Sequence, residues 1–124
     1  MRQETVHYFT EKEEEFANLF IEIGMKTNTA KILVFLASIT EATSRAIERG
    51  LDMRQPEVVI AMKSMLDRGW VRSRESTSGK GGRPMKIYEL AKPIIVIIDI
   101  IEKEEKNKAD NQFDICRKLR ECLQ

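Results

Sequence analysis

The chain has few of the residues from which reactive centres are usually built. Its 124 residues include one histidine and two cysteines. His7 has no cysteine or second histidine beside it, and Cys116 and Cys122 match no zinc-ligand spacing. The sequence also lacks a G-x-S-x-G nucleophile motif and a phosphate-loop lysine leading into a helix. We therefore expect no catalytic residue, no metal site and no cofactor, and an enzyme is the weakest interpretation.

Long hydrophobic runs are also missing. The longest, from Ile94 to Ile98, is far shorter than the roughly 20 residues that a membrane-spanning helix needs. The N-terminal residues are acidic and contain no apolar signal region. These features predict a cytoplasmic protein with no membrane partner.

The two cysteines do not predict a disulfide within the chain. Six residues separate Cys116 from Cys122, which on a helix places them roughly 240° apart. Small apolar packing residues are the favoured interpretation, and a redox sensor or an intermolecular disulfide is the alternative.

Charge is nearly balanced overall but unevenly distributed. The net charge is +1, yet residues 1–24 hold two cations against six carboxylates, and residues 70–88 hold five cations against Glu75 alone. Residues 79–86, GKGGRPMK, combine three glycines, three cations and a proline without a carboxylate. A local positive excess on a nearly neutral chain favours a polyanion site over a solubility device. A basic loop that is merely solvated is the alternative.

Four helices are predicted in the first 70 residues. Thr10 and Glu13 have the spacing of a capping box, and Gly24 ends the helix that they open. The fourth helix has Pro56 at its start and places Val58, Ala61, Met62 and Met65 on one face. The first predicted helix covers 10–24, the second begins near Asn28 or Thr29, the third runs from Thr43 or Ser44 to Gly50, and the fourth covers about 55–68. The short turn before the fourth helix indicates a helix-turn-helix unit.

The periodicity then changes from that of a helix to that of a strand. WVRSRE and KIYEL both alternate, so a β-hairpin is expected with the basic stretch as its loop. The predicted fold is mostly α with a small β-hairpin wing: a winged helix-turn-helix core over 28–92, an N-terminal helix over 10–24 and a C-terminal helix over 93–124, all within a single domain of residues 1–124. The last segment could be one helix or two, and its apolar start could instead be a strand.

This arrangement suits double-stranded DNA. A helix about 10–12 Å across fits the major groove. Cations on the hairpin would neutralise phosphates and release counterions, and Arg83, held by Pro84, could enter a narrow minor groove. Trp70 is expected in the core at the corner between helix and strand, with a base-stacking platform as the alternative.

Three segments carry a resemblance to a known superfamily: GMKTNTAKILVFLASI, LDMRQPEVVIAMKSMLDRGWV and GKGGRPMKIYEL. Together they resemble the archaeal and bacterial winged-helix transcription regulators of the MarR, ArsR and TrmB-like superfamily, over roughly residues 20–92. The resemblance implies a homodimer that binds an operator. Val59 and Ile60 depart from the pattern, because polar side chains are more usual at their positions.

Residue by residue, the resemblance implies DNA contacts from both helices of the unit and from the hairpin. Gln55 would read an adenine, Lys63 a phosphate, Ile60 a thymine methyl, and Glu57 would accept from a cytosine or else repel phosphates. The helix that precedes the recognition helix crosses the backbone in this motif. The candidate DNA-binding residues are Ser44, Arg45, Arg54, Gln55, Glu57, Ile60, Lys63, Ser64, Arg72, Arg74, Lys80, Arg83 and Lys86. Ser44 could instead be a plain helix cap, Arg72 and Arg74 a solvated strand face, and the outer helix face a surface packed on protein.

The apolar stripes of the first and last helices are expected to join two chains. The predicted dimer contacts are Phe16, Phe20, Ile94, Ile97, Ile98 and Ile101. Packing within one chain is the alternative for these residues. The leading hypothesis is a homodimeric transcriptional regulator that binds specific DNA, and the alternative is a winged-helix protein-interaction module in a larger assembly. No polar cluster in the sequence indicates a small-molecule effector.

Overall fold

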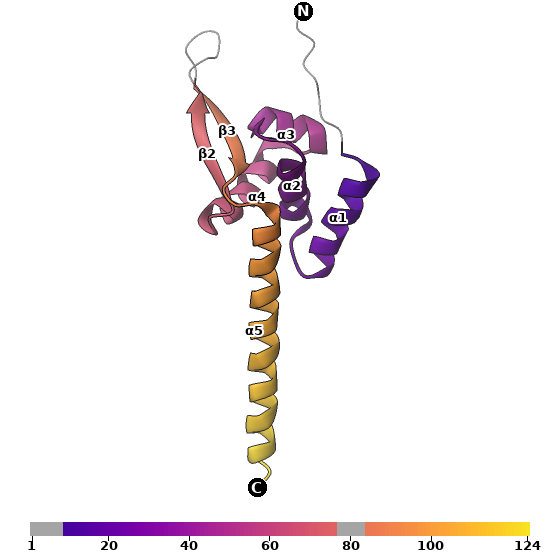
Figure 1. Cartoon of the computed structure of the whole chain (residues 1–124), viewed down its shortest axis with the longest axis vertical. Helices are drawn as coiled ribbons and strands as arrows, with labels where there is room; N and C mark the ends of the chain where they lie inside the picture. The colour runs from indigo at the N-terminus through magenta and orange to yellow at the C-terminus, as the bar shows by residue number, and fades with distance from the viewer. Residues whose placement is uncertain (1–8, 77–83) are drawn as a thin grey trace, which may run out of the picture. The chain divides into compact units, whose positions relative to one another are not determined.

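The computed structural model describes residues 9–76 and 84–124. The chain forms two compact units, one ending at Lys92 and the other beginning at Pro93, and each is described by itself. Apart from the short strand β1, the elements follow the order predicted from the sequence (Figure 1). The first unit holds α1 (Glu11–Glu22), α2 (Thr27–Ser38), β1 (Ala42–Thr43), α3 (Ser44–Leu51), α4 (Gln55–Asp67), β2 (Val71–Ser76) and β3 (Met85–Leu90), and the second holds α5 (Ile94–Glu121). The single domain over 1–124 stays a prediction.

Helix α1 begins as predicted at Thr10. The Thr10 hydroxyl accepts a hydrogen bond from the Glu13 backbone N–H at 3.2 Å, and three glutamates in the first turn complement the helix dipole. Gly24 ends the helix with a φ of +115°, which glycine adopts without strain. The Phe16 and Phe20 rings stack with centroids 5.0 Å apart. Phe20 is buried where α1 packs on α2, whereas the neighbouring Leu19 is exposed.

Helix α2 is the centre of the first unit. All of its residues from Thr29 to Leu36 except Lys31 are buried, as its almost uninterrupted apolar sequence predicts. It packs against α1 on one side and α4 on another. An apolar helix of this kind fixes the positions of the amphipathic helices around it.

Helices α3 and α4 form the predicted helix-turn-helix unit. Thr43 is the N-cap of α3 and accepts from the Ala46 N–H at 3.1 Å. After Leu51 the chain turns through Asp52, which has a left-handed φ of 51°, and the buried Met53 anchors the turn. Pro56 occupies the first turn of α4, where the missing N–H costs no helical hydrogen bond.

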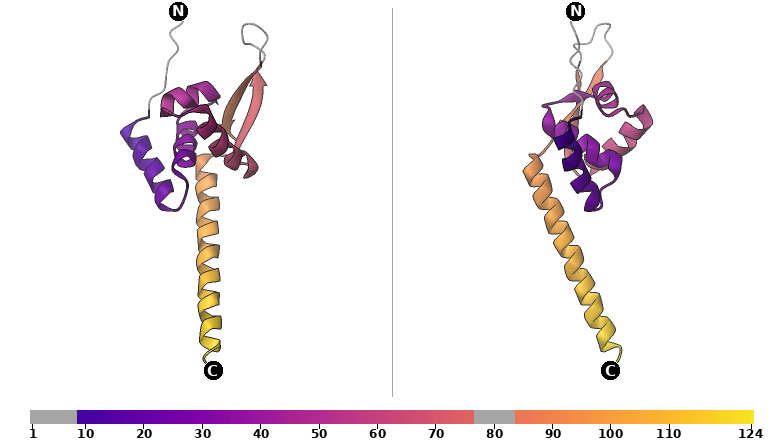
Figure 2. Two further views of the ribbon diagram at one scale, coloured as in Figure 1. Left: turned by 180° about the vertical axis from the view of Figure 1, so that it is seen from behind. Right: turned by 90° about the vertical axis from the view of Figure 1, so that its right-hand side faces the viewer.

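The strands form one antiparallel sheet in the order β1-β3-β2. Strands β2 and β3 make the predicted hairpin, with Val71 opposite Leu90 and Ser76 opposite Met85, and Figure 2 shows it extending away from the helices of its unit. The sequence did not predict β1, in which Ala42 pairs with Tyr88. Only two residues long, β1 has too little alternation to be recognised from its own sequence.

The second unit is the single uninterrupted helix α5, which decides between the one-helix and two-helix interpretations (Figure 1). Its apolar start is helical and is not a strand. Ile97 and Ile101 are buried, whereas every residue from Lys106 to the C-terminus is exposed. Among the described residues, no helix is both long and apolar enough to span a membrane.

Candidate nucleic-acid interface

The outer face of α4 is open to solvent. Val58, Ala61, Met62 and Met65 are buried, as predicted, so the opposite side of the helix faces outward. Ile60 is 71% exposed and Val59 is 53% exposed. Lys63 and Ser64 are also exposed, one turn further along the helix. The face therefore combines an apolar centre with a cation and a hydroxyl, and its outward side chains are available to a partner.

The start of α4 is fixed by a carboxylate. The backbone N–H of Arg54 donates to Glu57 Oε1 at 3.2 Å, and Asn28 Nδ2 donates to Glu57 Oε2 at 3.3 Å. Both carboxylate oxygens of Glu57 therefore hold protein groups, one in the turn and one on α2. Arg54 and Gln55 have exposed side chains beside this contact. The structure gives Glu57 a positioning role at the helix start.

Helix α3 presents Arg45 to solvent in its first turn. Thr43 is the N-cap, so the interpretation of Ser44 as the cap is wrong. The Ser44 hydroxyl instead donates to Glu48 Oε2 at 3.4 Å and is only half-buried. Arg45 and Ser44 thus sit at the end of α3 where the helix N–H groups and dipole favour an anion.

The hairpin divides its described cations between two faces. Side chains alternate along a strand, so Arg72 and Arg74 share one face, and the register places Glu89 and Ile87 opposite them. Lys86 lies on the other face, directly opposite Glu75. That second face also carries Val71 and Tyr88, which are buried. Arg72, Arg74 and Lys86 therefore do not form one continuous basic surface.

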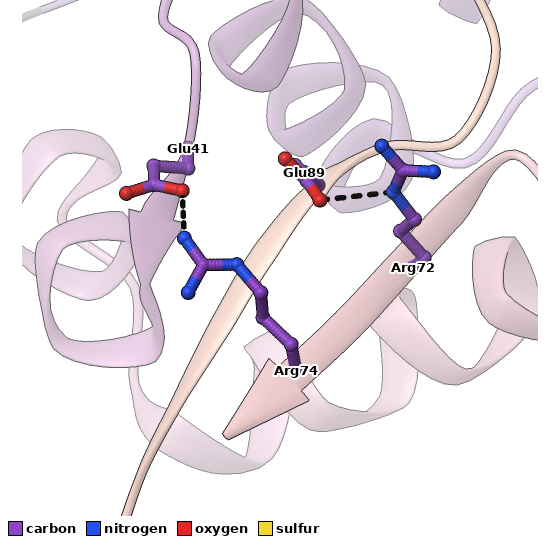
Figure 3. A network of polar contacts seen from close by, with 4 residues as sticks. All are labelled: Glu41, Arg72, Arg74 and Glu89. Carbon is purple, nitrogen blue, oxygen red and sulfur yellow. Dashed lines mark hydrogen bonds and ion pairs between the residues drawn. The ribbon is translucent and has the colours of Figure 1, made fainter. Parts of the chain in front are cut away.

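Arg72 and Arg74, which share one face of the hairpin, are both ion-paired within the chain (Figure 3). Arg72 Nε lies 2.9 Å from Glu89 Oε1 on the neighbouring strand, and Arg74 pairs with Glu41, which precedes β1. The arginine side chains remain 65% and 50% exposed. Exposed pairs of this kind are worth little, about 0–1 kcal/mol, so a phosphate could displace the carboxylates at small cost.

Comparisons of the structure with solved structures return transcriptional regulators. A "possible transcriptional regulator" from Methanosarcina mazei Go1 superimposes with a TM-score of 0.65 at 14% identity, over 87% of this chain and 86% of that one. A transcriptional regulator homologue from Pyrococcus horikoshii OT3 gives 0.54 at 16% identity, over 82% and 97% of the two chains. A MarR family transcription regulator gives 0.54 at 17% identity, over 80% and 64%. No protein-family model and no curated protein matches the sequence.

The chain has the winged-helix fold. At these identities the likeness shows the fold alone. Within this fold, α4 is the second helix of the helix-turn-helix unit, and the β2–β3 hairpin is the wing. The described residues contain no group of three or more histidine, cysteine, aspartate or glutamate side chains that could hold a metal ion.

Trp70 joins α4 to the wing. It is 2% exposed, and its backbone N–H bonds to the Met65 carbonyl at 3.0 Å. The Arg68 guanidinium lies 3.9 Å from the centroid of the indole ring. The indole is thus covered on one side by a cation–π contact and belongs to the core, as the sequence predicts, and its burial leaves no ring face for a base to stack on.

Two of the predicted site residues, Lys80 and Arg83, lie outside the described residues. Sequence reasoning also missed two residues that contact site residues although they are far from them in the sequence: Asn28 bonds to Glu57, and Glu41 pairs with Arg74. Asn28 is 29 positions from Glu57, and Glu41 is 33 positions from Arg74. No local pattern connects residues so far apart, so nothing in the sequence could have identified these contacts.

Proposed function

We propose that the chain is a transcriptional regulator that binds specific double-stranded DNA as a homodimer. Recognition helix α4 would enter the major groove, and the wing, residues 72–86, would contact the backbone or minor groove. The observation that carries the proposal is the open outer face of α4, on which Ile60 is 71% exposed and Lys63 and Ser64 lie beside it. The likeness to solved transcriptional regulators supports it.

The proposed contacts fall into three groups. On α4, Gln55 would read an adenine, Ile60 would touch a thymine methyl, and Lys63 would meet a phosphate. On α3, Arg45 and Ser44 would contact the backbone strand that this helix crosses. The remaining backbone and groove contacts come from the turn and the wing: Arg54, Ser64, Arg72, Arg74, Lys80, Arg83 and Lys86. Glu57 leaves the set of base contacts, because its carboxylate oxygens bind Arg54 and Asn28.

The dimer part of the proposal needs a revised set of contacts. Of the predicted residues, Phe20, Ile97 and Ile101 are already buried in the single chain. Apolar side chains that remain exposed on α1, at its C-cap and in the first turn of α5 are Leu19, Ile23, Ile95 and Val96. These four side chains and the half-buried Phe16, Ile94 and Ile98 expose more apolar surface to a second copy than the buried Phe20, Ile97 and Ile101 do. A regulator of this kind would bind DNA in the cytoplasm. It would not catalyse a reaction.

A first test is the salt dependence of binding to random duplex DNA. Neutralising about four phosphates per complex should weaken binding about 100-fold between about 50 and 200 mM salt, because each contact contributes about 0.9 to the slope of log affinity against log salt. Changing both Lys80 and Arg83 to alanine should flatten that slope, as measured by fluorescence anisotropy. A matched control changes the exposed Lys12 and Lys26, on and beside α1, to alanine and should leave the slope unchanged.

The specific part of the proposal is tested by selecting bound sites from genomic DNA fragments. Enrichment of a two-fold symmetric sequence is expected, because a symmetric dimer presents two recognition helices to one duplex. Salt-insensitive binding, or no binding at low salt, would contradict the proposal. Either result would favour the protein-interaction module, for which the exposed pair Val59 and Ile60 would be the contact surface.

Release of Arg74 from its partner should strengthen DNA binding. Glu41→Gln removes the carboxylate that pairs with Arg74, so the guanidinium would be free for a phosphate and a negative charge would leave the wing. We expect affinity for random duplex to rise about three- to ten-fold at low salt, with a salt slope steeper by up to about one unit per protomer. Glu15→Gln, on the exposed side of α1, removes the same charge elsewhere. An equal gain from both variants would show that net charge alone is responsible.

A further inference from the structure

The distal part of α5 carries an apolar stripe with no covering partner in its own unit. Phe113 is 70% exposed, Leu119 is 62% exposed and Leu123 is 87% exposed. Spacings of three and four residues place four side chains of α5 on one side of the helix, with Phe113 at its edge: Ala109, Gln112, Cys116 and Leu119. Leu123, two residues beyond the helix end at Glu121, continues the same spacing. This heptad pattern is typical of a helix that pairs with another helix.

Charges along α5 alternate in blocks. Residues 99–105 hold four carboxylates against one lysine, residues 106–108 hold two lysines, residues 110–114 hold two aspartates, and residues 117–121 hold three cations against one glutamate. Two such helices paired in parallel and in register would place each block beside its own copy, and like charges would repel. Paired antiparallel about residues 110 and 111, the acidic block 99–105 meets the basic block 117–121, and Lys106 and Lys108 meet the segment that holds Asp114, whereas Asp110 lies near its own copy at the axis. The pattern is thus complementary to itself under a two-fold axis.

We propose that α5 pairs antiparallel with α5 of a second copy of this chain, with the two-fold axis crossing near Asp110 and Asn111. This inference deepens the homodimer of the proposed function and rests on it. Two residues that face each other across the pair have numbers that add up to 221. For pairs at the edges of the interface the numbers add up to a value one or two lower or higher. Ala109 then faces the partner's Gln112, and Glu105 faces the partner's Cys116.

The flanking positions of this register carry complementary chemistry. Asp99 and the partner's Arg120 meet as opposite charges, and Asp99 is exposed and so available for the pair. Lys106 lies over the ring of the partner's Phe113, a geometry suited to a cation–π contact. Each contact occurs twice by symmetry. The antiparallel orientation also opposes the two helix dipoles, which is favourable.

A charge exchange tests the orientation in the full-length protein. Asp99→Arg or Arg120→Asp alone should weaken the dimer about ten-fold, because each creates two repulsive contacts where two attractive ones stood. Combining both changes should restore the dimer to within about three-fold of the original affinity, as measured by sedimentation equilibrium. In a parallel pair the two positions would lie about 31 Å apart along the helix, so the combination would not rescue. Failure of rescue, or no effect of either single change, would overturn the proposal.

Disulfide formation tests the register. In the antiparallel pair the two copies of Cys116 lie about 16 Å apart along the axis, beyond the roughly 7 Å that a disulfide can bridge. In a Cys122→Ser background, oxidised glutathione should therefore produce no covalent dimer on a non-reducing gel. Adding Glu105→Cys should produce one, because position 105 faces the partner's Cys116. A covalent dimer without the added cysteine, or none with it, would overturn the register.

Site selection on the same protein separates this inference from the proposed function. A selected operator without the cross-link would leave the DNA-binding proposal standing and remove the α5 pairing. The cross-link without any DNA binding would leave the α5 pairing standing and remove the DNA-binding proposal.

Discussion

Replacing Ile60 with glutamate is expected to abolish selective DNA binding while the protein stays folded. Ile60 is 71% exposed at the centre of the outer face of α4, so its side chain contributes little to the core. A carboxylate there would replace the proposed thymine-methyl contact and repel the phosphates that line the groove. With two such sites per dimer, affinity for the selected operator should fall about 100-fold or more. Binding would be measured by fluorescence anisotropy, and folding by thermal unfolding.

The matched control is Asn18→Glu, which adds the same charge at an exposed position on α1. It should lower affinity only slightly, through net charge alone. Neither variant should change the free energy of unfolding by more than about 0.5 kcal/mol, because both positions are exposed. If the Ile60 variant selected the same sites with the same affinity, α4 would not be the reading element, and the proposed function would lose its main support.

Replacing Trp70 with alanine is expected to lower the free energy of unfolding by about 3–5 kcal/mol. The indole is 2% exposed and fills the corner where α4 passes into β2, so its removal leaves a cavity that the surrounding backbone cannot close. The loss should be measured by urea unfolding at equilibrium. For a small domain, a loss of this size is a large part of the total stability.

A weaker substitution separates the packing role of Trp70 from a role in binding. Arg68→Ala removes the guanidinium that lies 3.9 Å from the indole centroid and should cost only about 0.5–1 kcal/mol. If Trp70→Ala instead left stability unchanged and weakened binding to single-stranded nucleic acid, the base-stacking interpretation would replace the core one.

Much of the fold was predictable because it depends on neighbours in the chain. The buried face of α4 follows from the spacing of Val58, Ala61, Met62 and Met65, and all four are buried. The start of α1 follows from Thr10, whose hydroxyl reaches a backbone N–H three residues away. The hairpin follows from alternation on both sides of a glycine-rich stretch. Patterns of this kind operate within one or two turns or along one strand, so the sequence displays them directly.

The candidate site was less predictable, because its electrostatics depend on residues far apart in the chain. The sequence presents Glu57, Arg72 and Arg74 as charges available to DNA. In the fold, Glu57 holds Arg54 and Asn28 at the start of α4, while the two arginines pair with Glu89 and Glu41. Strand β1 shows the same limit, since Ala42 becomes a strand residue only by pairing with Tyr88.

The sequence by itself determined the order of the five helices and of the hairpin strands, the core face of α4 and the separation of charge along the chain and along α5. Only the tertiary structure decided which of those charges are already paired and how the wing divides its cations between two faces. The physical reason is the range of the interactions. Periodicity and capping act between residues a few positions apart, whereas an ion pair requires two side chains that only the folded backbone brings together.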